Sequence, residues 1–206
     1  MSNFKEGILE CNGLSLRYAE SGQGQPVVVF SAGEGVLSDD VAAELATQHR
    51  VIVFDVAASG LGKNQDFAGQ LAQALAQLGV ASFSVIGVAR GITPALAQAV
   101  YTPGQVHRLV LLSPPLAAVQ NPEVGARLAE IKAPTLVLVG TRDRSGSREA
   151  GRMLRERVPT CHLLLVYEAG PAIAADRREA CCAPIGEFLE QGEGFIVSHD
   201  SQLIRP

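Results

Sequence analysis

A five-residue segment, Gly87-Val88-Ala89-Arg90-Gly91, has the glycine spacing of a strained strand-to-helix turn. In the pattern G-x-S-x-G, small outer residues let the chain turn sharply, and the turn presents the central serine hydroxyl as a nucleophile. Here the central residue is Ala89, whose methyl group cannot attack a carbonyl carbon. The segment therefore predicts the turn without its nucleophile.

The elements that would position this turn are short apolar, β-branched runs that alternate with alanine-rich helical patterns. Strands are expected at residues 14–18, 27–31, 51–54, 82–87, 109–113, 135–140 and 162–167, and helices at 39–48, 67–78, 94–100, 122–131, 147–157 and 177–189. Most strands from residue 51 onward are apolar on both faces, as parallel strands covered by helices on each side are. The alternation predicts an α/β fold, with a doubly wound, mostly parallel sheet in three α/β/α layers.

The two ends of the chain differ from this pattern. Residues 14–18 alternate apolar and polar side chains, which predicts an antiparallel edge strand that turns at residues 21–26 into the next strand. Residues 191–206 follow the last expected helix. We expect one domain over residues 1–190 and a C-terminal tail over 191–206 with room for one extra short strand.

Composition narrows the class of protein. The chain has 206 residues, of which 47% are hydrophobic and 18% charged, so it has the apolar side chains that a core needs and is not intrinsically disordered. A net charge of −4, 5% aromatic residues and no tryptophan favour no nucleic-acid partner. No run approaches the roughly 18 apolar residues of a membrane span, and the N-terminus lacks a signal-peptide core. We expect a soluble, cytoplasmic protein without a membrane partner.

Metal, redox and nucleotide chemistry are not expected. Four cysteines, Cys11, Cys161, Cys181 and Cys182, are too few and too unevenly spaced for a disulfide scaffold or a zinc site, so we interpret them as buried or half-buried thiols. The glycine-bearing segment at residues 59–63 lacks the spacing of a phosphate-binding loop. We therefore predict no cofactor and no metal ion.

Four further segments, in order along the chain, extend the pattern around Ala89. Residues 13–22 resemble the opening hairpin of the α/β-hydrolase superfamily, and residues 51–62 resemble its D-x-P-G-x-G-x-S loop. Residues 106–113 and 133–143 match later strands of that family. Together with the turn, the likeness covers roughly residues 8–190. It implies the α/β-hydrolase fold and gives each position of a Ser-His-Asp triad a counterpart here.

These counterparts predict a degenerate triad. The resemblance places the nucleophile at Ala89 and the acid at Asp143. The base would be the histidine of a Gly-His pair after the last strand, where this chain reads Gly170-Pro171. Because Pro171 has no side chain that carries a proton, hydrolase activity is not expected from this set and no residue is assigned as catalytic.

No histidine replaces the missing base. His49, His107 and His162 lie at or before strand starts, at the end of the sheet away from the site, and His199 lies in the tail. Asp143 then has two interpretations. It is a remnant of the triad acid, or a loop residue that caps or pairs with one of the arginines at positions 142, 144 and 148.

Backbone amides need no particular side chain, so an anion site remains possible at the turn. The amides of Arg90 and of Gly33 or Glu34 would bind a carboxylate or phosphate at a helix N-terminus. We predict a ligand site formed by Ser31, Gly33, Glu34, Ala89 and Arg90. A Glu34–Arg90 ion pair across it is a further hypothesis.

The family's lid would lie within residues 114–132, which hold only 19 residues. This length suits one small helix and no lid domain, so the pocket would be open, and uncovered surface of this kind often binds a partner. We predict a lidless, non-catalytic protein that binds a small, anionic ligand or a protein partner, including a second copy of the chain. The alternative is an atypical hydrolase or lyase that uses Asp143, Ser31, Ser59 or Glu34.

Overall fold

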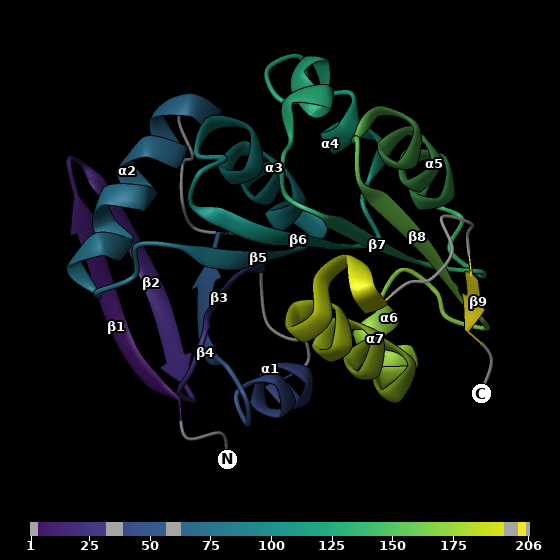
Figure 1. Ribbon diagram of the computed structural model, residues 1–206, viewed down its shortest axis with the longest axis horizontal. Helices are drawn as coiled ribbons and strands as arrows, with labels where there is room; N and C mark the ends of the chain where they lie inside the picture. Colours follow the sequence, from purple (N-terminus) through teal and green to yellow (C-terminus); the bar gives the residue numbers. More distant parts are fainter. Residues whose placement is uncertain (1–3, 32–38, 57–62, 196–201, 205–206) are drawn as a thin grey trace.

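The computed structural model describes residues 4–31, 39–56, 63–195 and 202–204 (Figure 1). The strands are β1 (Lys5–Cys11), β2 (Leu14–Ser21), β3 (Pro26–Ser31), β4 (Arg50–Asp55), β5 (Phe83–Val88), β6 (Val106–Leu112), β7 (Thr135–Gly140), β8 (Cys161–Val166) and β9 (Gln202–Ile204). They form one sheet in the order β1-β2-β4-β3-β5-β6-β7-β8-β9. β1 and β2 are antiparallel to their neighbours, and the remaining pairs are parallel.

The α-helices lie in two layers, one on each face of the sheet (Figure 1). They are α1 (Asp39–Leu45), α2 (Asn64–Gln77), α3 (Ile92–Tyr101), α4 (Leu116–Val119), α5 (Ser147–Arg157), α6 (Ile173–Asp176) and α7 (Arg178–Gln191). Three short 3-10 helices accompany them: η1 (Ala89–Gly91), η2 (Gly125–Glu130) and η3 (Gly192–Phe195). Buried side chains of α2, α3 and α5 pack on one face of the sheet, and those of α1, α6 and α7 pack on the other. The predicted doubly wound, three-layer α/β fold is confirmed.

The antiparallel edge differs from the prediction. β2 is not an edge strand, because β1 pairs with it on the outside and β4 on the inside, so the turn at residues 21–26 does not pair β2 with β3. The β1–β2 hairpin turns at Asn12-Gly13, both with positive φ (48° and 84°), as a tight two-residue turn requires. The sequence pattern did not predict β1, because Leu9 is the only fully buried residue of this strand.

Residues 114–132 pack against α3 and α5. They form α4 and η2, and the buried Val119, Val124 and Leu128 of this segment join the core beside α3 and α5. The expected helix at residues 122–131 is in fact the shorter 3-10 turn η2, and α4 was not predicted. Glu123 anchors the segment to α2, because the backbone amide of Asn64 donates to Glu123 Oε2 at 3.0 Å.

The carboxyl ends of β3, β5, β6, β7 and β8 lie along one edge of the sheet, so the loops that follow them are neighbours. The short strand β9 pairs in parallel with β8 and extends the sheet, as expected for the tail. No described helix is both long and apolar enough to cross a membrane.

Close packing at the start of α3 gives a first prediction. A Cβ atom on Gly91 would overlap the backbone carbonyl of Phe30, at the end of β3. Gly91→Ala should therefore lower the free energy of unfolding by about 2 to 3 kcal/mol in urea denaturation. Gly69→Ala is the control, because that α2 position has open space and should gain about 0.5 to 1 kcal/mol. Equal effects of the two substitutions would contradict this account of the packing.

Candidate functional site

The turn after β5 has the geometry of a nucleophile elbow, with an alanine at its tip. Val88 is extended (φ −131°, ψ 130°), and Ala89 then adopts a left-handed φ of 51° before η1 leads into α3. The outer glycines are required, because a Cβ on Gly87 would lie 2.7 Å from Ala95 Cβ and one on Gly91 would meet Phe30. The left-handed conformation costs a non-glycine residue about 1 to 2 kcal/mol.

The predicted ligand residues fall partly within the described chain. Ser31 is buried at the end of β3, and its carbonyl accepts a hydrogen bond from the Val56 amide at 2.8 Å. Ala89 is half-buried and Arg90 is exposed on the same edge of the sheet. Gly33, Glu34 and Ser59 lie outside the described residues, and so does the Glu34–Arg90 ion pair.

Asp143 lies buried in the loop after β7, where its own loop holds it. Asp143 Oδ1 accepts hydrogen bonds from the Ser145 amide at 2.8 Å and from Ser145 Oγ at 2.6 Å. Burial raises the pKa of Asp143, but the hydrogen bonds from the amide and hydroxyl of Ser145, together with the nearby hydroxyls of Ser147 and Ser113, outweigh it and hold the pKa below its usual range. The carboxylate is therefore charged at neutral pH and is a weak proton acceptor.

The arginines proposed as partners of Asp143 bind elsewhere or are solvated. Arg142 pairs with Glu168 at 2.7 Å, and Arg148 donates to the carbonyl of Thr141 at 2.9 Å. Arg144 is exposed, and no ion pair joins it to Asp143 within the described chain. Of the loop interpretation of Asp143, the structure therefore shows the capping of its own loop through the Ser145 amide and no ion pair with these arginines.

Ser113 is a site residue that the sequence analysis did not single out. It directly follows β6 with a left-handed φ of 46°, and its amide donates to the Leu138 carbonyl of β7 at 2.9 Å. Its hydroxyl and Asp143 Oδ2 are both buried without a hydrogen bond of good geometry. The sequence did contain a signal for this residue. Ser113 is a polar residue at the carboxyl end of the apolar strand β6, and β6 pairs with β7, which leads to Asp143.

The loop that would carry the base lies against the loop of Asp143. The Glu168 amide donates to Thr141 Oγ1 at 2.9 Å, and the Arg142–Glu168 ion pair spans the same two loops. The Gly170 amide donates to Asp176 Oδ2 at 2.7 Å, an anchor that the sequence did not indicate. Pro171 follows as an exposed residue. The structure therefore brings the Asp143 and Pro171 loops together, at the edge where Ala89 lies.

The described histidines lie at the amino edge of the sheet, away from Ala89. His49 precedes β4, and His107 and His162 are the second residues of β6 and β8. His49 and His162 are buried, and His107 shares a hydrogen bond with Ser82 at 2.9 Å. His199 lies outside the described residues. None of the three described histidines can serve the elbow.

Cysteine thiols and metal ligands are two further kinds of chemistry that the described chain could supply. Burial raises the pKa of both Cys161 and Cys181 to about 12, so these thiols are protonated and unreactive at neutral pH. All four cysteines are free, and Cys181 and Cys182 are both buried. No cluster of His, Cys, Asp and Glu in the described residues could hold a metal ion.

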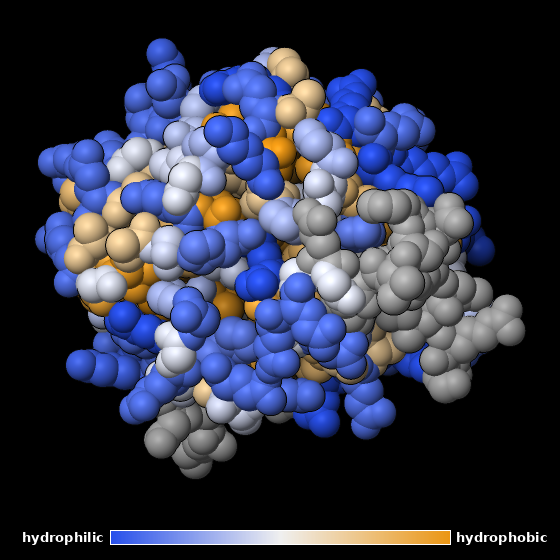
Figure 2. Space-filling model, in the orientation of Figure 1, coloured by the Kyte–Doolittle hydropathy of each residue, from blue (hydrophilic) through white to orange (hydrophobic). Residues whose placement is uncertain are grey.

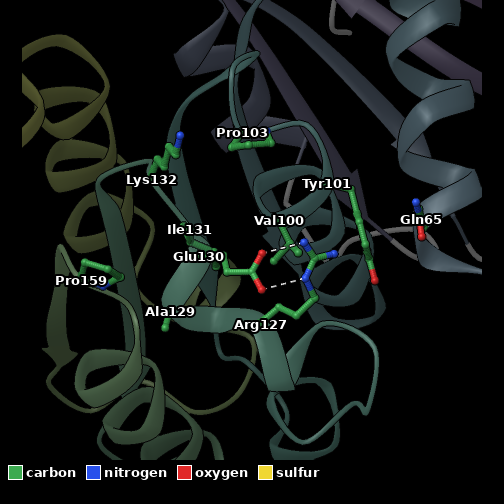
Figure 3. A pocket seen from close by; sticks show the side chains of 10 residues that line it. All are labelled: Gln65, Val100, Tyr101, Pro103, Arg127, Ala129, Glu130, Ile131, Lys132 and Pro159. Atoms are coloured by element: carbon green, nitrogen blue, oxygen red, sulfur yellow. Dashed lines mark hydrogen bonds and ion pairs between the residues drawn. The ribbon is translucent and has the colours of Figure 1, made fainter.

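A separate groove of about 840 Å³ lies outside the predicted site, between α3 and η2 (Figure 3). Its central side chain is Arg127, which pairs with Glu130 at 2.6 Å and lies 4.6 Å from the centre of the Tyr101 ring. Because these contacts already satisfy Arg127, the groove offers no free cation from this residue.

Comparison with known proteins identifies the fold. No protein-family model and no curated protein matches the sequence. The chain is similar in structure to naproxen esterase from Bacillus subtilis (TM-score 0.76, 15% identity, 91% of this chain and 92% of that chain). It is also similar to 2-hydroxy-6-oxo-6-phenylhexa-2,4-dienoate hydrolase from Rhodococcus sp. strain RHA1 (0.75, 14%, 92% and 100%).

A third similar structure is an α/β-hydrolase-fold protein from Chitinophaga pinensis (TM-score 0.72, 15% identity, 92% of this chain and 98% of that chain). The chain has the α/β-hydrolase fold, as the sequence resemblance implied.

The left-handed backbone of Ala89 gives a second prediction. Ala89→Gly should raise the free energy of unfolding by about 1 kcal/mol, because glycine adopts a positive φ without steric cost. Ala72→Gly in α2 is the matched control and should lower it by about 1 kcal/mol, since that residue is helical. Chemical denaturation measures both, and a loss of stability in Ala89→Gly would count against the strain.

The hydrogen bonds of Asp143 give a third prediction. Asp143→Asn should lower the free energy of unfolding by about 1 to 2 kcal/mol at pH 7. Because the folded-state pKa lies below that of an unfolded aspartate, about 3.9, the carboxylate's contribution is complete above that pH. It is lost as the pH falls through the folded-state pKa.

Urea titrations of native and Asp143→Asn protein between pH 7 and pH 2 measure this difference. Ser145→Ala, which removes one donor to Oδ1, should reproduce part of the loss at pH 7. A difference between the two proteins that is constant over the whole pH range would refute the role assigned to the charge.

Proposed function

We propose that this chain is a non-catalytic α/β-hydrolase-fold protein that binds a small anionic ligand at the elbow. The observation that carries the proposal is Ala89, which keeps the left-handed backbone of a nucleophile elbow and has no nucleophilic atom. Pro171, in the loop beside Asp143, adds no proton carrier. A carboxylate that binds here meets neither a nucleophile nor a base, and so it is not turned over.

The proposed ligand contacts are backbone amides. Residues 89–91 form η1, which leads directly into α3, so their N–H groups lie at the positive end of the helix dipole. Close packing of Gly87 and Gly91 fixes the direction of these amides. Exposed Arg90 would add a cation at the rim, and the amides of Gly33 and Glu34 are proposed to complete the site. A carboxylate is the ligand class that this set favours.

An atypical hydrolase is the second candidate, and Asp143 is the observation that favours it. Its Oδ2 is buried and without a hydrogen bond, beside the hydroxyl of Ser113. Its depressed pKa makes it a weak general base, which is why we prefer the binding function. The sequence features given above support two further parts of the proposal. These are a protein partner that docks over a lidless, open face, and a cytoplasmic location.

Esterase activity tests the proposed function and forms the fourth prediction. Native protein should not hydrolyse p-nitrophenyl butyrate above the background rate, whereas Ala89→Ser combined with Pro171→His should gain measurable turnover. Adding Asp143→Asn to that variant should reduce the gained rate by about a hundredfold or more, because the introduced histidine loses its orienting carboxylate. Each single substitution alone is the matched control and should stay inactive.

Ligand binding is measured on the same proteins. Butyrate should perturb the backbone amide NMR signals of residues 90 and 91 in native protein, and Ala89→Glu should abolish the effect by placing a carboxylate at the anion position. Turnover by native protein that Asp143→Asn abolishes would overturn the non-catalytic proposal in favour of the atypical hydrolase. If native protein neither binds butyrate nor hydrolyses the ester, the proposed function of the elbow is wrong.

A further inference from the structure

The segment from Arg142 to Arg157, which includes α5, has a charge opposite to that of the whole chain. It holds six arginines and three acidic residues, which gives a formal charge of +3, and it has no lysine. The rest of the chain holds eleven basic and eighteen acidic residues, which gives −7. Figure 2 shows strongly hydrophilic surface over this helix, at the upper right of the view. The positive charge of the protein is therefore concentrated locally.

Helical spacing places three of these arginines together. α5 buries Ala150, Gly151 and Leu154 against the sheet. Arg148, Arg152 and Arg155 follow one another by four and then three residues, so they lie along one flank of the helix. We call these three residues the arginine flank. Arg148 and Arg152 are exposed and Arg155 is half-buried.

The exposed part of the arginine flank has no acidic partner in the described chain. Arg148 donates to the neutral carbonyl of Thr141, and no carboxylate of the described residues lies within ion-pair distance of Arg148 or Arg152. Glu149 and Glu156 belong to the same helix but form no ion pair with them. Like charges four residues apart on a helix repel each other, and an external anion would relieve that repulsion.

We propose that the arginine flank of α5 is a docking surface for a protein partner that presents closely spaced carboxylates. The guanidinium group binds a carboxylate through two parallel hydrogen bonds, and this geometry distinguishes arginine from lysine. Glu149 and Glu156 interrupt the positive field beside the flank, which suits a short acidic segment better than the continuous phosphate backbone of a nucleic acid. The net charge of −4 further disfavours a long polyanion.

A labelled peptide of glutamates and glycines tests this surface by fluorescence anisotropy, as the fifth prediction. Native protein should bind the peptide at an ionic strength of about 0.1 M, where the Debye length is about 10 Å. Arg148→Glu combined with Arg152→Glu should weaken binding by about tenfold or more. The control is Arg17→Glu combined with Lys63→Glu, which changes the net charge equally at two exposed sites elsewhere. It should weaken binding by no more than about threefold, since charges beyond a Debye length are screened.

Several results would overturn the proposal. Two of them concern the peptide: native protein does not bind it, or the two double variants weaken its binding equally. The other two are tighter binding of a DNA duplex than of the peptide, and salt-sensitive self-association of the protein in sedimentation velocity. Self-association would mean that the arginine flank binds acidic residues of a second copy of the chain, such as Glu44, Glu187 and Glu190 in the groove between α1 and α7. Circular dichroism checks folding, and Arg148→Gln with Arg152→Gln replaces the reversal variant if that variant unfolds.

Discussion

The close approach of the start of α3 to the end of β3 determines the candidate site. At Gly91 the chain passes so near the Phe30 carbonyl that no side chain fits, and at Gly87 a Cβ atom would lie 2.7 Å from Ala95 Cβ. Between these two glycines the backbone must turn sharply from strand to helix, and the left-handed conformation of Ala89 follows from that requirement. The same approach sets Ser31 beside the turn. The elbow is thus a property of the packing around it and does not depend on which side chain occupies its tip.

The loops beside the elbow are held by contacts of their own. Asp143 is satisfied at Oδ1 by Ser145, two residues along the chain, and so does not need a histidine to stay in place. Thr141 and Arg142 hold Glu168 in the neighbouring loop. These bonds lie within or between the loops and involve no residue at position 171. These contacts hold the loop geometry without a nucleophile at position 89 and without a proton-carrying side chain at position 171.

Segments that are largely buried were predicted from the sequence more accurately than segments that are exposed or short. β7 and α5 match their predicted bounds, because every residue of β7 is buried and α5 alternates between core and solvent at helical spacing. β1 and α4 were missed, since β1 buries one residue fully and α4 has only four. The contact of Ser113 with Asp143 could not be predicted, because the register of β6 and β7 brings together residues that lie far apart in sequence. Asn12-Gly13 was a readable hairpin signal.

Strain at Ala89 and the binding proposed for the elbow are separate consequences of one constraint. Because the packing at Gly87 and Gly91 fixes the turn, the amides of residues 90 and 91 hold their direction whether position 89 carries a hydroxyl, a methyl group or only hydrogen. In a hydrolase such fixed donors stabilise the charge that develops on the substrate oxygen, and their effect depends on prior orientation. Replacing serine by alanine removes the attack on the substrate and leaves these donors in place. Under the proposed function, these donors form an anion site at the elbow, and the ligand class that suits it is a carboxylate, the product class of ester hydrolysis.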